Sequence, residues 1–336
     1  MKVGIIGTGG IAQLHARGLK SCGHEIAAVA DISPQRAGDF AQKWNTVACS
    51  IEQLLKQKLD LVSVTVPNVF HFEVAAQAIQ AGHAVLCEKP MACNPAESAK
   101  LVQLVARHGQ PFFAGYMKRS HPTMQRFREY AARIGTPRSG LVRVYHPFPL
   151  HMWGWMAEQL KKDPQSLRPT VFNDGVFVNS GSHMLDLLLW SAGGVRRVLA
   201  SRFQRHEGVT TDTAAHALLE MDNGATVTVE CGWLPLTGVG RRENGWDEVL
   251  ELRGDDGLAR LFTTWWDRPE TESPVADLWH EPTRQTETFN AGPVDYFAKE
   301  YELIALALQG QKVPLATVTE AAAVDTLIYD IFAAAK

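Results

Sequence analysis

Cysteine is scarce in this chain, and its few copies form no recognisable pattern. Only five of the 336 residues are cysteines: Cys22, Cys49, Cys87, Cys93 and Cys231. Their number is odd and no two have C-x-x-C spacing, so the sequence supports neither a disulfide framework nor a cysteine-rich zinc site. We expect reduced thiols that mostly fill the core.

Charge of one sign is also lacking. The chain carries 33 Lys and Arg against 36 Asp and Glu, a net charge of -3, with no long run of either sign. A basic stripe is the usual footprint of a nucleic-acid partner, so none is expected. The 12 histidines are scattered, and His146 and His151 in "HPFPLH" lack the spacing of a helical metal pair, so no metal site is predicted.

Long hydrophobic runs, internal repeats and low-complexity tracts are missing as well. The N-terminal "MKVGIIGTGG" holds one lysine and a short apolar run interrupted by glycines. Because that run is too short for a signal peptide or a membrane span, we expect a cytoplasmic protein without a membrane partner. The composition, 46% hydrophobic and 21% charged, is that of a globular protein long enough for two domains.

The first third of the chain alternates strand and helix patterns. Predicted strands cover residues 3–6, 26–30, 61–66, 84–87 and 112–115, and predicted helices cover residues 11–19, 35–44, 72–80 and 96–107. The strands are apolar along their length, which is typical of strands buried on both faces. This alternation predicts a doubly wound parallel sheet, an α/β Rossmann domain over residues 1–120.

The pattern changes after about Arg119. A helical stretch at 123–134 is followed by strand candidates at 195–203, 214–221, 226–233 and 249–253, and helices at 294–308 and 319–335 close the chain. Asn223-Gly224, between two of these strands, is a hairpin signal. Hairpin connections predict antiparallel pairing, so residues 121–336 are expected to form an α+β domain.

The first predicted strand leads directly into a glycine-rich turn that opens a helix. Its residues are Gly7, Thr8, Gly9, Gly10, Ile11 and Ala12, which fit the G-x-G-x-x-A dinucleotide fingerprint. Gly7 allows the tight turn, Gly9 lets the backbone approach a pyrophosphate, and Ala12 keeps helix and strand close. The helix N-terminus supplies N–H donors to the phosphates. The turn therefore predicts a dinucleotide site.

Asp31 indicates which dinucleotide is bound. It lies 22 residues after Gly9, at the end of the second predicted strand, where a carboxylate accepts hydrogen bonds from the adenosine ribose. A carboxylate repels a 2′-phosphate, and Ile32 and Ser33 follow it rather than a cation. Arg36, one helical turn away, is within reach of such a phosphate. We expect NAD as the cofactor, with NADP as the alternative.

Four motifs together resemble one known family. They are the glycine turn, "VPNVFH" (Val66–His71), "AGHAVLCEKP" (Ala81–Pro90) and "GSHMLDLLLW" (Gly181–Trp190), and the closing "TVTEAAAVDTLIYDIFAAA" is similar too. In order and spacing they resemble the glucose-fructose oxidoreductase / inositol dehydrogenase (Gfo/Idh/MocA) family. The resemblance implies a Rossmann domain followed by a domain on an open, mainly antiparallel sheet. It also implies hydride transfer between nicotinamide and a carbon bearing a hydroxyl or carbonyl.

Lys89 matches the catalytic lysine of that family. It follows a predicted strand end, where doubly wound sheets bind ligands, and Pro90 restricts the backbone around it. An ammonium there would hydrogen-bond a substrate oxygen and offset charge that develops on it. The alternative is a surface lysine paired with Glu88.

His183 matches the histidine of the second domain, so the resemblance implies that it is the acid/base group. The alternative is a buried or capping histidine, and Asp186 is spaced to orient its ring. Many relatives have aspartate four residues earlier, where this chain has Asn179. An amide binds a hydroxyl but cannot share a proton. Either His183 works without that charge, or Asn179 only binds substrate, or the chemistry departs from plain alcohol oxidation.

The resemblance and the chain order suggest the remaining site residues. Pro67, Asn68, His71, Glu88 and Lys89 are predicted to lie near the cofactor, although His71 is equally well explained as a residue that starts a helix. Predicted substrate contacts are Asn179, Tyr116, Lys118, Trp153, Trp155 and Arg168, with Arg119, Asn173 and Asp174 as weaker candidates. Tryptophan faces stack on sugar rings, but they also fill cores and subunit interfaces.

These observations predict an NAD(P)-dependent oxidoreductase that acts on a sugar, cyclitol or sugar derivative. Two alternatives stay open. One is a lyase or glycosidase that oxidises its substrate transiently with bound NAD, and the other is a dinucleotide-sensing protein without catalysis. The resemblance also implies a homodimer or homotetramer.

Overall fold

The computed structural model describes residues 1–147, 175–205, 211–266 and 270–335. The chain divides into two compact units, and each is described by itself below. Met1–His121 and Asp295–Asp325 form the first unit, and Pro122–Val294 and Thr326–Lys336 form the second.

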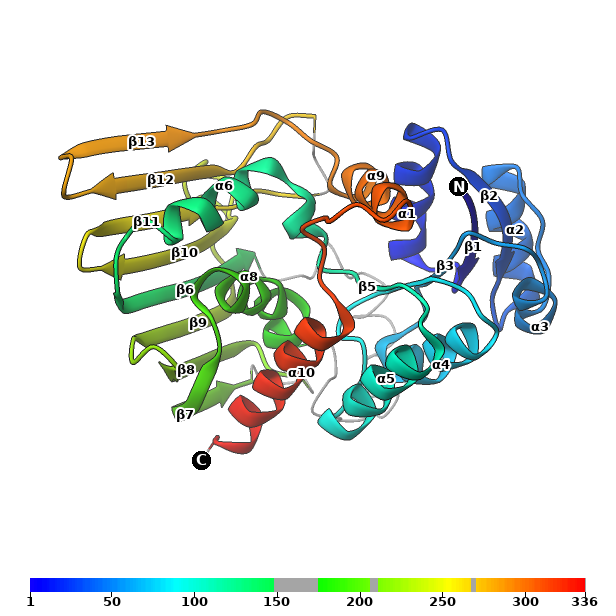
Figure 1. The fold of residues 1–336 in the computed structure, drawn as a ribbon, viewed down its shortest axis with the longest axis horizontal. Helices are drawn as coiled ribbons and strands as arrows, with labels where there is room; N and C mark the ends of the chain where they lie inside the picture. The colour runs from blue at the N-terminus through cyan, green and yellow to red at the C-terminus, as the bar shows by residue number, and fades with distance from the viewer. Residues whose placement is uncertain (148–174, 206–210, 267–269, 336) are drawn as a thin grey trace. The chain divides into compact units, whose positions relative to one another are not determined.

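The first unit contains a five-stranded parallel sheet, labelled in Figure 1. Its strands are β1 (Lys2–Ile6), β2 (Glu25–Ala30), β3 (Leu61–Val64), β4 (Val85–Cys87) and β5 (Phe112–Ala114), in the order β2-β1-β3-β4-β5. This confirms the predicted doubly wound sheet. The strand order reverses between β1 and β3, and ligands bind at the carboxyl ends of the strands on either side of such a reversal.

Helices follow the strands in the predicted rhythm. They are α1 (Gly10–Ser21), α2 (Pro34–Trp44), α3 (Ile51–Leu55), α4 (His71–Gln80) and α5 (Pro95–His108), with 3-10 turns η1 (Asn68–Phe70) and η2 (Met117–Ser120). Local chemistry explains several starts: Ser33 and Asn94 cap α2 and α5, and each helix begins with proline. The sequence prediction lacks α3 and the two 3-10 turns, because elements of five residues or fewer are too short for a visible period.

Helix α9 (Tyr296–Leu308) belongs to the first unit, although the sequence prediction placed it in the second domain. Tyr301 and Ile304 are fully buried in the same core as Val3 and Ile5 of β1. A Cβ added to Gly18 of α1 would lie 2.8 Å from the backbone nitrogen of Ala298, so the two helices pack with their backbones close together. This packing is why the compact units differ from the predicted division at residue 120.

The second unit is built on an eight-stranded sheet. Its strands are β6 (Pro137–Pro147), β7 (Val195–Gln204), β8 (Ala214–Met221), β9 (Thr226–Leu234), β10 (Asp247–Gly254), β11 (Gly257–Phe262), β12 (Val275–His280) and β13 (Gln285–Phe289). The order is β13-β12-β11-β10-β6-β9-β8-β7, and every neighbouring pair is antiparallel except β6 and β9. The predicted open, mainly antiparallel sheet is confirmed, including the hairpin at Asn223-Gly224 between β8 and β9.

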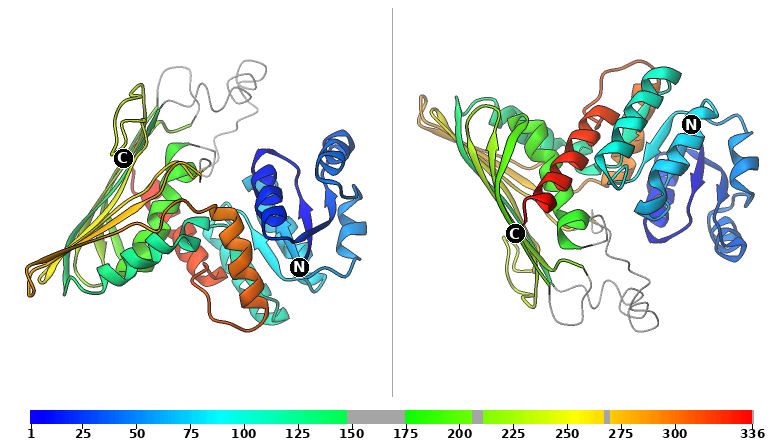
Figure 2. Two further views of the ribbon diagram at one scale, coloured as in Figure 1. Left: turned by 90° about the horizontal axis from the view of Figure 1, so that it is seen from above. Right: turned by 90° about the horizontal axis from the view of Figure 1, so that it is seen from below.

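Helices cover one face of this sheet, as Figure 2 shows. They are α6 (Pro122–Ala131), α8 (Ser182–Ala192) and the last part of α10 (Val318–Ala333), and a short π-helix, η4 (Phe177–Gly181), runs directly into α8. The Ser201 hydroxyl on β7 donates to the Ile331 carbonyl of α10 at 2.6 Å. Burial alternates along most of β8 and β9. Because successive side chains of a strand point to opposite faces, this alternation shows that one face of these strands is packed.

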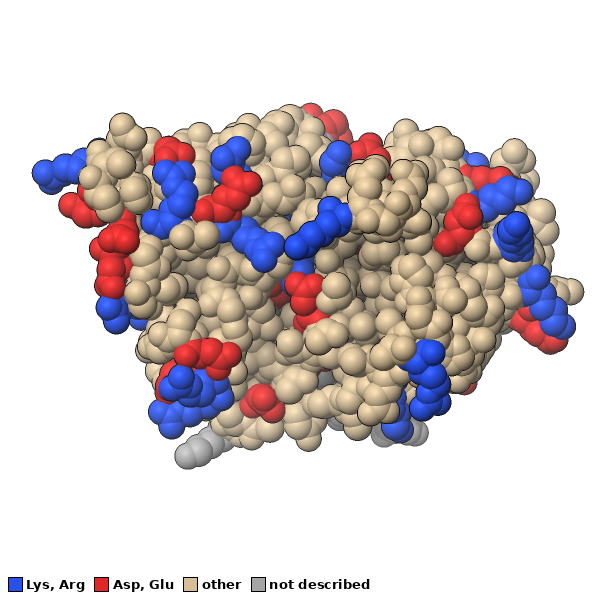
Figure 3. Space-filling model, viewed as in Figure 1, with Lys and Arg blue, Asp and Glu red and all other residues tan. Residues whose placement is uncertain are grey.

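Surface charges of both signs are interspersed on the face drawn in Figure 3. One ion pair between exposed side chains joins Arg138 to Asp255 through two hydrogen bonds of 2.7 Å. Among the described residues, no helix is long and apolar enough to cross a membrane.

Candidate active site

The glycine turn after β1 has the geometry that the fingerprint predicts. Gly7 adopts a φ of +94°, and a Cβ there would lie 2.6 Å from the backbone nitrogen of Val66. Only glycine fits this position, because both the left-handed backbone and the approach to the next strand exclude a side chain. Ala12 is fully buried against the sheet.

Gly9 and Gly10 differ from Gly7, because no atom of the described chain lies within 4 Å of a Cβ built on either one. Protein packing therefore does not explain these two glycines. Gly9 is the N-cap of α1, and no side chain in the described ranges caps this helix start. Without a side-chain cap among the described residues, the first N–H groups of α1 suit the pyrophosphate of a dinucleotide.

Asp31 lies beside this turn, at the end of β2. Its carboxylate accepts from the Thr8 backbone and hydroxyl at 2.8 and 2.9 Å, from the Ser33 N–H at 2.8 Å, and from Arg36 at 2.7 Å. Burial alone would raise the pKa of Asp31, but these donors outweigh it and the pKa is lowered. The predicted preference of this carboxylate for a ribose over a 2′-phosphate stays a prediction. The Arg36 side chain beside it is 60% exposed.

The segment after β3 holds Pro67, Asn68 and His71. Pro67 is exposed and Asn68 is partly exposed, so both are accessible in the described structure. His71 is only 2% exposed, and its ring nitrogens lie 2.6 Å from the Pro90 carbonyl and 2.8 Å from the Val66 carbonyl. Burial lowers its pKa, against a smaller opposing effect of these carbonyls. His71 therefore ties two loops together, and its predicted contact with a cofactor stays a prediction.

The Glu88-Lys89-Pro90 turn follows β4, as predicted. Glu88 is 8% exposed, and its carboxylate accepts from His15 Nε2 at 2.9 Å and from the Lys89 backbone N–H at 3.2 Å. Burial would raise the pKa of Glu88, but the hydrogen bond and charge of His15 outweigh it and the pKa is lowered. Lys89 is partly exposed beyond the strand end, which is consistent with a role at a ligand.

The sequence did not indicate the groups that hold Glu88. His15 Nδ1 lies 2.9 Å from the Tyr301 hydroxyl, which lies 2.8 Å from the Ser63 hydroxyl. Glu300, the neighbour of Tyr301, is fully buried, and burial raises its pKa well above the usual range. No local sequence signal linked these groups, because Tyr301 lies 286 residues from His15.

Asp325 of α10 holds the residues that follow Pro90. It is fully buried, and its Oδ2 accepts from the Ser98 hydroxyl at 2.9 Å. Burial raises the pKa of Asp325 to about 8, although the Ser98 hydroxyl and the N–H groups of Ala92 and Met91 oppose the rise. The Asp325 carboxyl of α10 thus holds in place the backbone that follows Lys89 and Pro90.

Tyr116, Lys118 and Arg119 follow β5. Each is 1% exposed, so none is a solvated side chain of a linker. Arg119 pairs with Glu320 at 2.7 Å. The predicted substrate contacts of Tyr116 and Lys118 stay predictions.

The second unit presents Asn179 from the π-helix η4. A π-helical turn is rare and is frequently found at functional sites. Here it leaves Asn179 and Ser180 partly exposed between buried neighbours. The buried Asp212 anchors its start by accepting from the Phe177 N–H at 2.9 Å. Burial raises the pKa of Asp212 to about 6.

His183 lies in the first turn of α8 and is 7% exposed, with Asp186 fully buried on the same helix. His183 and Asn179 belong to the second unit, whereas Lys89 belongs to the first. Trp153, Trp155, Arg168, Asn173 and Asp174 lie outside the described residues.

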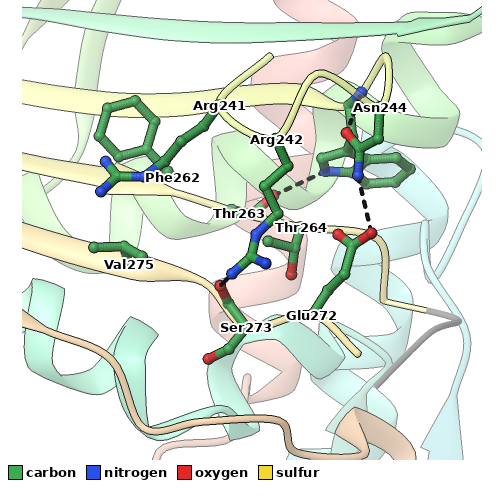
Figure 4. A pocket seen from close by; sticks show the side chains of 10 residues that line it. Arg241, Arg242, Asn244, Phe262, Thr263, Thr264, Glu272, Ser273 and Val275 are labelled. Atoms are coloured by element: carbon green, nitrogen blue, oxygen red, sulfur yellow. Dashed lines mark hydrogen bonds between the residues drawn. The ribbon is translucent and has the colours of Figure 1, made fainter. Parts of the chain in front are cut away.

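A pocket in the second unit lies near the ends of β10 to β12, and Figure 4 shows its lining. Its polar groups are largely bonded to one another. Arg242 donates to the Ser273 carbonyl at 3.2 Å, and Asn244 donates to Glu272 at 2.9 Å. This pairing suits a structural role better than ligand binding. The Thr263 hydroxyl of this pocket donates to the buried Glu248. Glu248 lies 3.1 Å from His146, whose other ring nitrogen lies 3.3 Å from the Ser180 hydroxyl of η4.

No group of three or more His, Cys, Asp or Glu side chains within the described ranges has the arrangement of a metal site. All five cysteines are free.

Comparison with known proteins identifies both halves of the chain. Residues 1–116 match the model of the GFO_IDH_MocA oxidoreductase family with an NAD-binding Rossmann fold, and residues 127–260 match the GFO/IDH/MocA C-terminal domain.

Individual relatives extend this match over most of the sequence. Myo-inositol dehydrogenase Hyg17 from Streptomyces leeuwenhoekii is 32% identical over 292 residues, which are 80% of this chain and 83% of that protein. D-xylose 1-dehydrogenase (NADP(+)) 2 from Haloferax volcanii is 26% identical over 342 residues, covering 100% and 98%. The structure of UDP-N-acetylglucosamine 3-dehydrogenase from Acidithiobacillus ferrooxidans aligns with a TM-score of 0.77 at 23% identity, covering 100% and 97%.

Proposed function

Because this chain belongs to the Gfo/Idh/MocA family of oxidoreductases, we propose that it transfers hydride between nicotinamide and a hydroxyl or carbonyl carbon of a sugar or cyclitol. The chain is an NAD(P)-dependent oxidoreductase. The single observation that carries the assignment is the conjunction of an open, uncapped glycine turn with the Glu88-Lys89-Pro90 turn two strands away in the same sheet.

The bound dinucleotide would supply the hydride acceptor or donor. The chain's own residues would hold it: the N–H groups at the start of α1 bind the pyrophosphate, and Asp31 binds the adenosine ribose. The Asp31 carboxylate would repel a 2′-phosphate, whereas the nearby Arg36 guanidinium would attract it. Asp31 is the more buried of the two and its charge faces the turn directly, so NAD is the proposed cofactor and NADP the alternative.

Lys89 is proposed to hydrogen-bond the reacting oxygen of the substrate. An alcohol that loses hydride also loses its hydroxyl proton, and an ammonium stabilises the negative charge that builds up on the oxygen. The Glu88 carboxylate accepts a hydrogen bond from the backbone N–H of Lys89 and is itself bonded to His15, so the backbone from which the lysine side chain extends is held in place. His183 and Asn179, both of the second unit, are proposed to contact substrate hydroxyls.

Substrate class follows from the relatives rather than from the described side chains. The relatives named above act on inositol, xylose and a sugar nucleotide, so polyhydroxylated rings are the proposed substrates. We further propose a cytoplasmic homodimer or homotetramer. The five free thiols support a reducing compartment, and analytical ultracentrifugation would report the oligomer.

The decisive experiment combines a substrate screen with a Lys89→Ala variant. Inositols, aldoses, sugar acids and sugar nucleotides are offered with NAD or NADP, and reduced nicotinamide is followed by absorbance. We expect turnover with at least one compound, and Lys89→Ala should abolish it while isothermal titration calorimetry shows unchanged NAD binding. Full activity of Lys89→Ala would show that the lysine is structural. Substrate consumption without net NADH would instead favour a lyase that oxidises its substrate transiently.

A further inference from the structure

Asn179 lies on the π-turn η4, in which the backbone hydrogen bonds are displaced by one residue. In an α-helix the N–H of Ser182 would bond the carbonyl four residues back, which belongs to Val178. In η4 the Ser182 N–H instead bonds the carbonyl of Phe177, five residues back. The Val178 carbonyl therefore does not receive the N–H that a regular helix would direct to it. Val178 is 1% exposed and Ser182 is fully buried, so a missing donor there would be costly.

The side chain of Ser182 replaces that donor. Its hydroxyl lies 2.6 Å from the Val178 carbonyl, and because a carbonyl can only accept, the hydroxyl is the donor. In ordinary helices a serine hydroxyl often bonds the same carbonyl as its own N–H. Here one residue bonds two successive carbonyls, that of Phe177 through its backbone and that of Val178 through its side chain. The Ser182 hydroxyl thus compensates for the π register.

Both ends of the π-turn are held by other contacts of the second unit. At its start, the Asp212 carboxylate accepts from the Phe177 N–H at 2.9 Å, and the Asp212 backbone carbonyl accepts from the Val176 N–H at 3.1 Å. At its end, a Cβ added to Gly181 would lie 3.0 Å from the Cys231 sulfur of β9, so the backbone packs closely on the sheet. These contacts fix where the turn lies, and its internal register is left to the hydrogen bonds within it.

The register decides which side chains of this segment are accessible. Within residues 175–188, Asn179 and Ser180 are partly exposed and the neighbours on either side are buried. Successive residues of a helix are turned by about 100°, since 3.6 residues make one turn. A change from the π register to the α register, which is a change of one residue, would therefore turn Asn179 by about that angle relative to α8.

We propose that Ser182 is a positioning residue of this enzyme, because its hydroxyl maintains the π register that presents Asn179 to the substrate. The inference rests on the proposed function, in which Asn179 contacts a substrate hydroxyl, and deepens it. Ser182 is fully buried, so it acts through Asn179 and touches no substrate itself. His183 keeps its proposed role, since it lies in the first turn of α8, beyond the π-turn.

The test compares Ser182→Ala with Ser201→Ala, which removes a hydroxyl that also donates to a backbone carbonyl at 2.6 Å in the same unit. We expect Ser182→Ala to lower kcat/KM for the substrate found in the screen by roughly 10²-fold, since a small misplacement of a substrate contact has an effect of that size. The affinity of Ser182→Ala for NAD and the activity of Ser201→Ala should stay unchanged. If Ser182→Ala keeps kcat/KM within about threefold of wild type, the proposal is wrong.

A double-mutant cycle separates positioning from a general effect on stability. Asn179→Ala should lower kcat/KM by itself, and adding Ser182→Ala to it should cause little further loss, because the side chain that the hydroxyl positions is already gone. Equal losses in both backgrounds would show that Ser182 does not act through Asn179 and would overturn the proposal. A kcat/KM that Asn179→Ala leaves unaffected would contradict the proposed substrate contact and the inference with it.

A crystallographic comparison does not depend on turnover. In Ser182→Ala we expect the N–H of position 182 to bond the Val178 carbonyl in an α register, with the Asn179 side chain turned away from its wild-type direction. An unchanged π-turn would overturn the proposal even if the activity falls. A wild-type protein that oxidises or reduces no substrate would contradict the proposed function, whereas a changed register in the variant would still support the role of the hydroxyl.

Discussion

The buried carboxyl of Asp325 makes the stability of this protein depend on pH in a way that one substitution should remove. Its pKa is about 8 in the folded protein, against an ordinary value of 3.8. A raised pKa means that the folded state binds the proton more tightly than the unfolded state. The contribution to stability is therefore complete below about pH 4 and is lost as pH rises to about 8.

The magnitude follows from the size of the pKa shift. At 1.36 kcal/mol per unit, raising the pKa from 3.8 to about 8 corresponds to a total change on the order of 6 kcal/mol, of which about 4 kcal/mol falls between pH 5 and pH 9. Asparagine has nearly the same shape, keeps an oxygen for the Ser98 hydroxyl, and does not titrate. The Asp325→Asn variant should therefore gain stability relative to wild type as pH rises.

The assay is urea unfolding followed by far-ultraviolet circular dichroism at pH 5, 7 and 9. Other groups titrate in both proteins, so the quantity of interest is the difference in unfolding free energy between variant and wild type. Asp330→Asn, which changes an exposed carboxylate of the same helix, is the matched control and should show a constant difference. A difference for Asp325→Asn that stays constant within about 1 kcal/mol from pH 5 to pH 9 would refute the reasoning.

Three further predictions concern the first unit. Gly9→Val should weaken NAD binding at least tenfold in calorimetry while leaving the melting temperature of the free protein unchanged, because its side chain enters space that no described atom occupies; unchanged affinity would contradict the assigned pyrophosphate site. Gly18→Val should cost about 1–3 kcal/mol in urea unfolding, since its Cβ would lie 2.8 Å from the Ala298 nitrogen, whereas the unobstructed Gly38→Ala should not destabilise. Asp31→Ser should shift the ratio of kcat/KM values toward NADP, and an unaltered ratio would show that this carboxylate does not discriminate.

Local signals in the sequence accounted for most of the first unit. The apolar strands, the Ser33-Pro34 start of α2 and the glycine turn each depend on residues within a few positions of one another, so they can be read from the chain directly. Asn223-Gly224 predicted the β8–β9 hairpin for the same reason.

Features that depend on distant residues could not be read in this way. The parallel pairing of β6 with β9 joins residues 139–147 to residues 226–234, and no local pattern distinguishes it from a hairpin. His15 and Tyr301 meet only because α9 packs on α1, and His146 meets Glu248 only because β6 lies beside β10. The motifs marked residues that are proposed to face a ligand, but they did not indicate the residues that hold those side chains in place.

The placement of α9 has a consequence for how the protein is made. All five strands of the parallel sheet have been synthesised by residue 121, but the segment that covers Val3 and Ile5 with Tyr301 and Ile304 is synthesised about 180 residues later. Until α9 is synthesised, the apolar side chains of β1 that it covers stay exposed in the nascent chain. We therefore expect the nucleotide-binding unit to complete its fold only after residues 122–294 of the second unit have been translated. A fragment that ends at residue 121 would leave this apolar surface of β1 exposed, whereas a circular permutant that begins at residue 295 would supply α9 first.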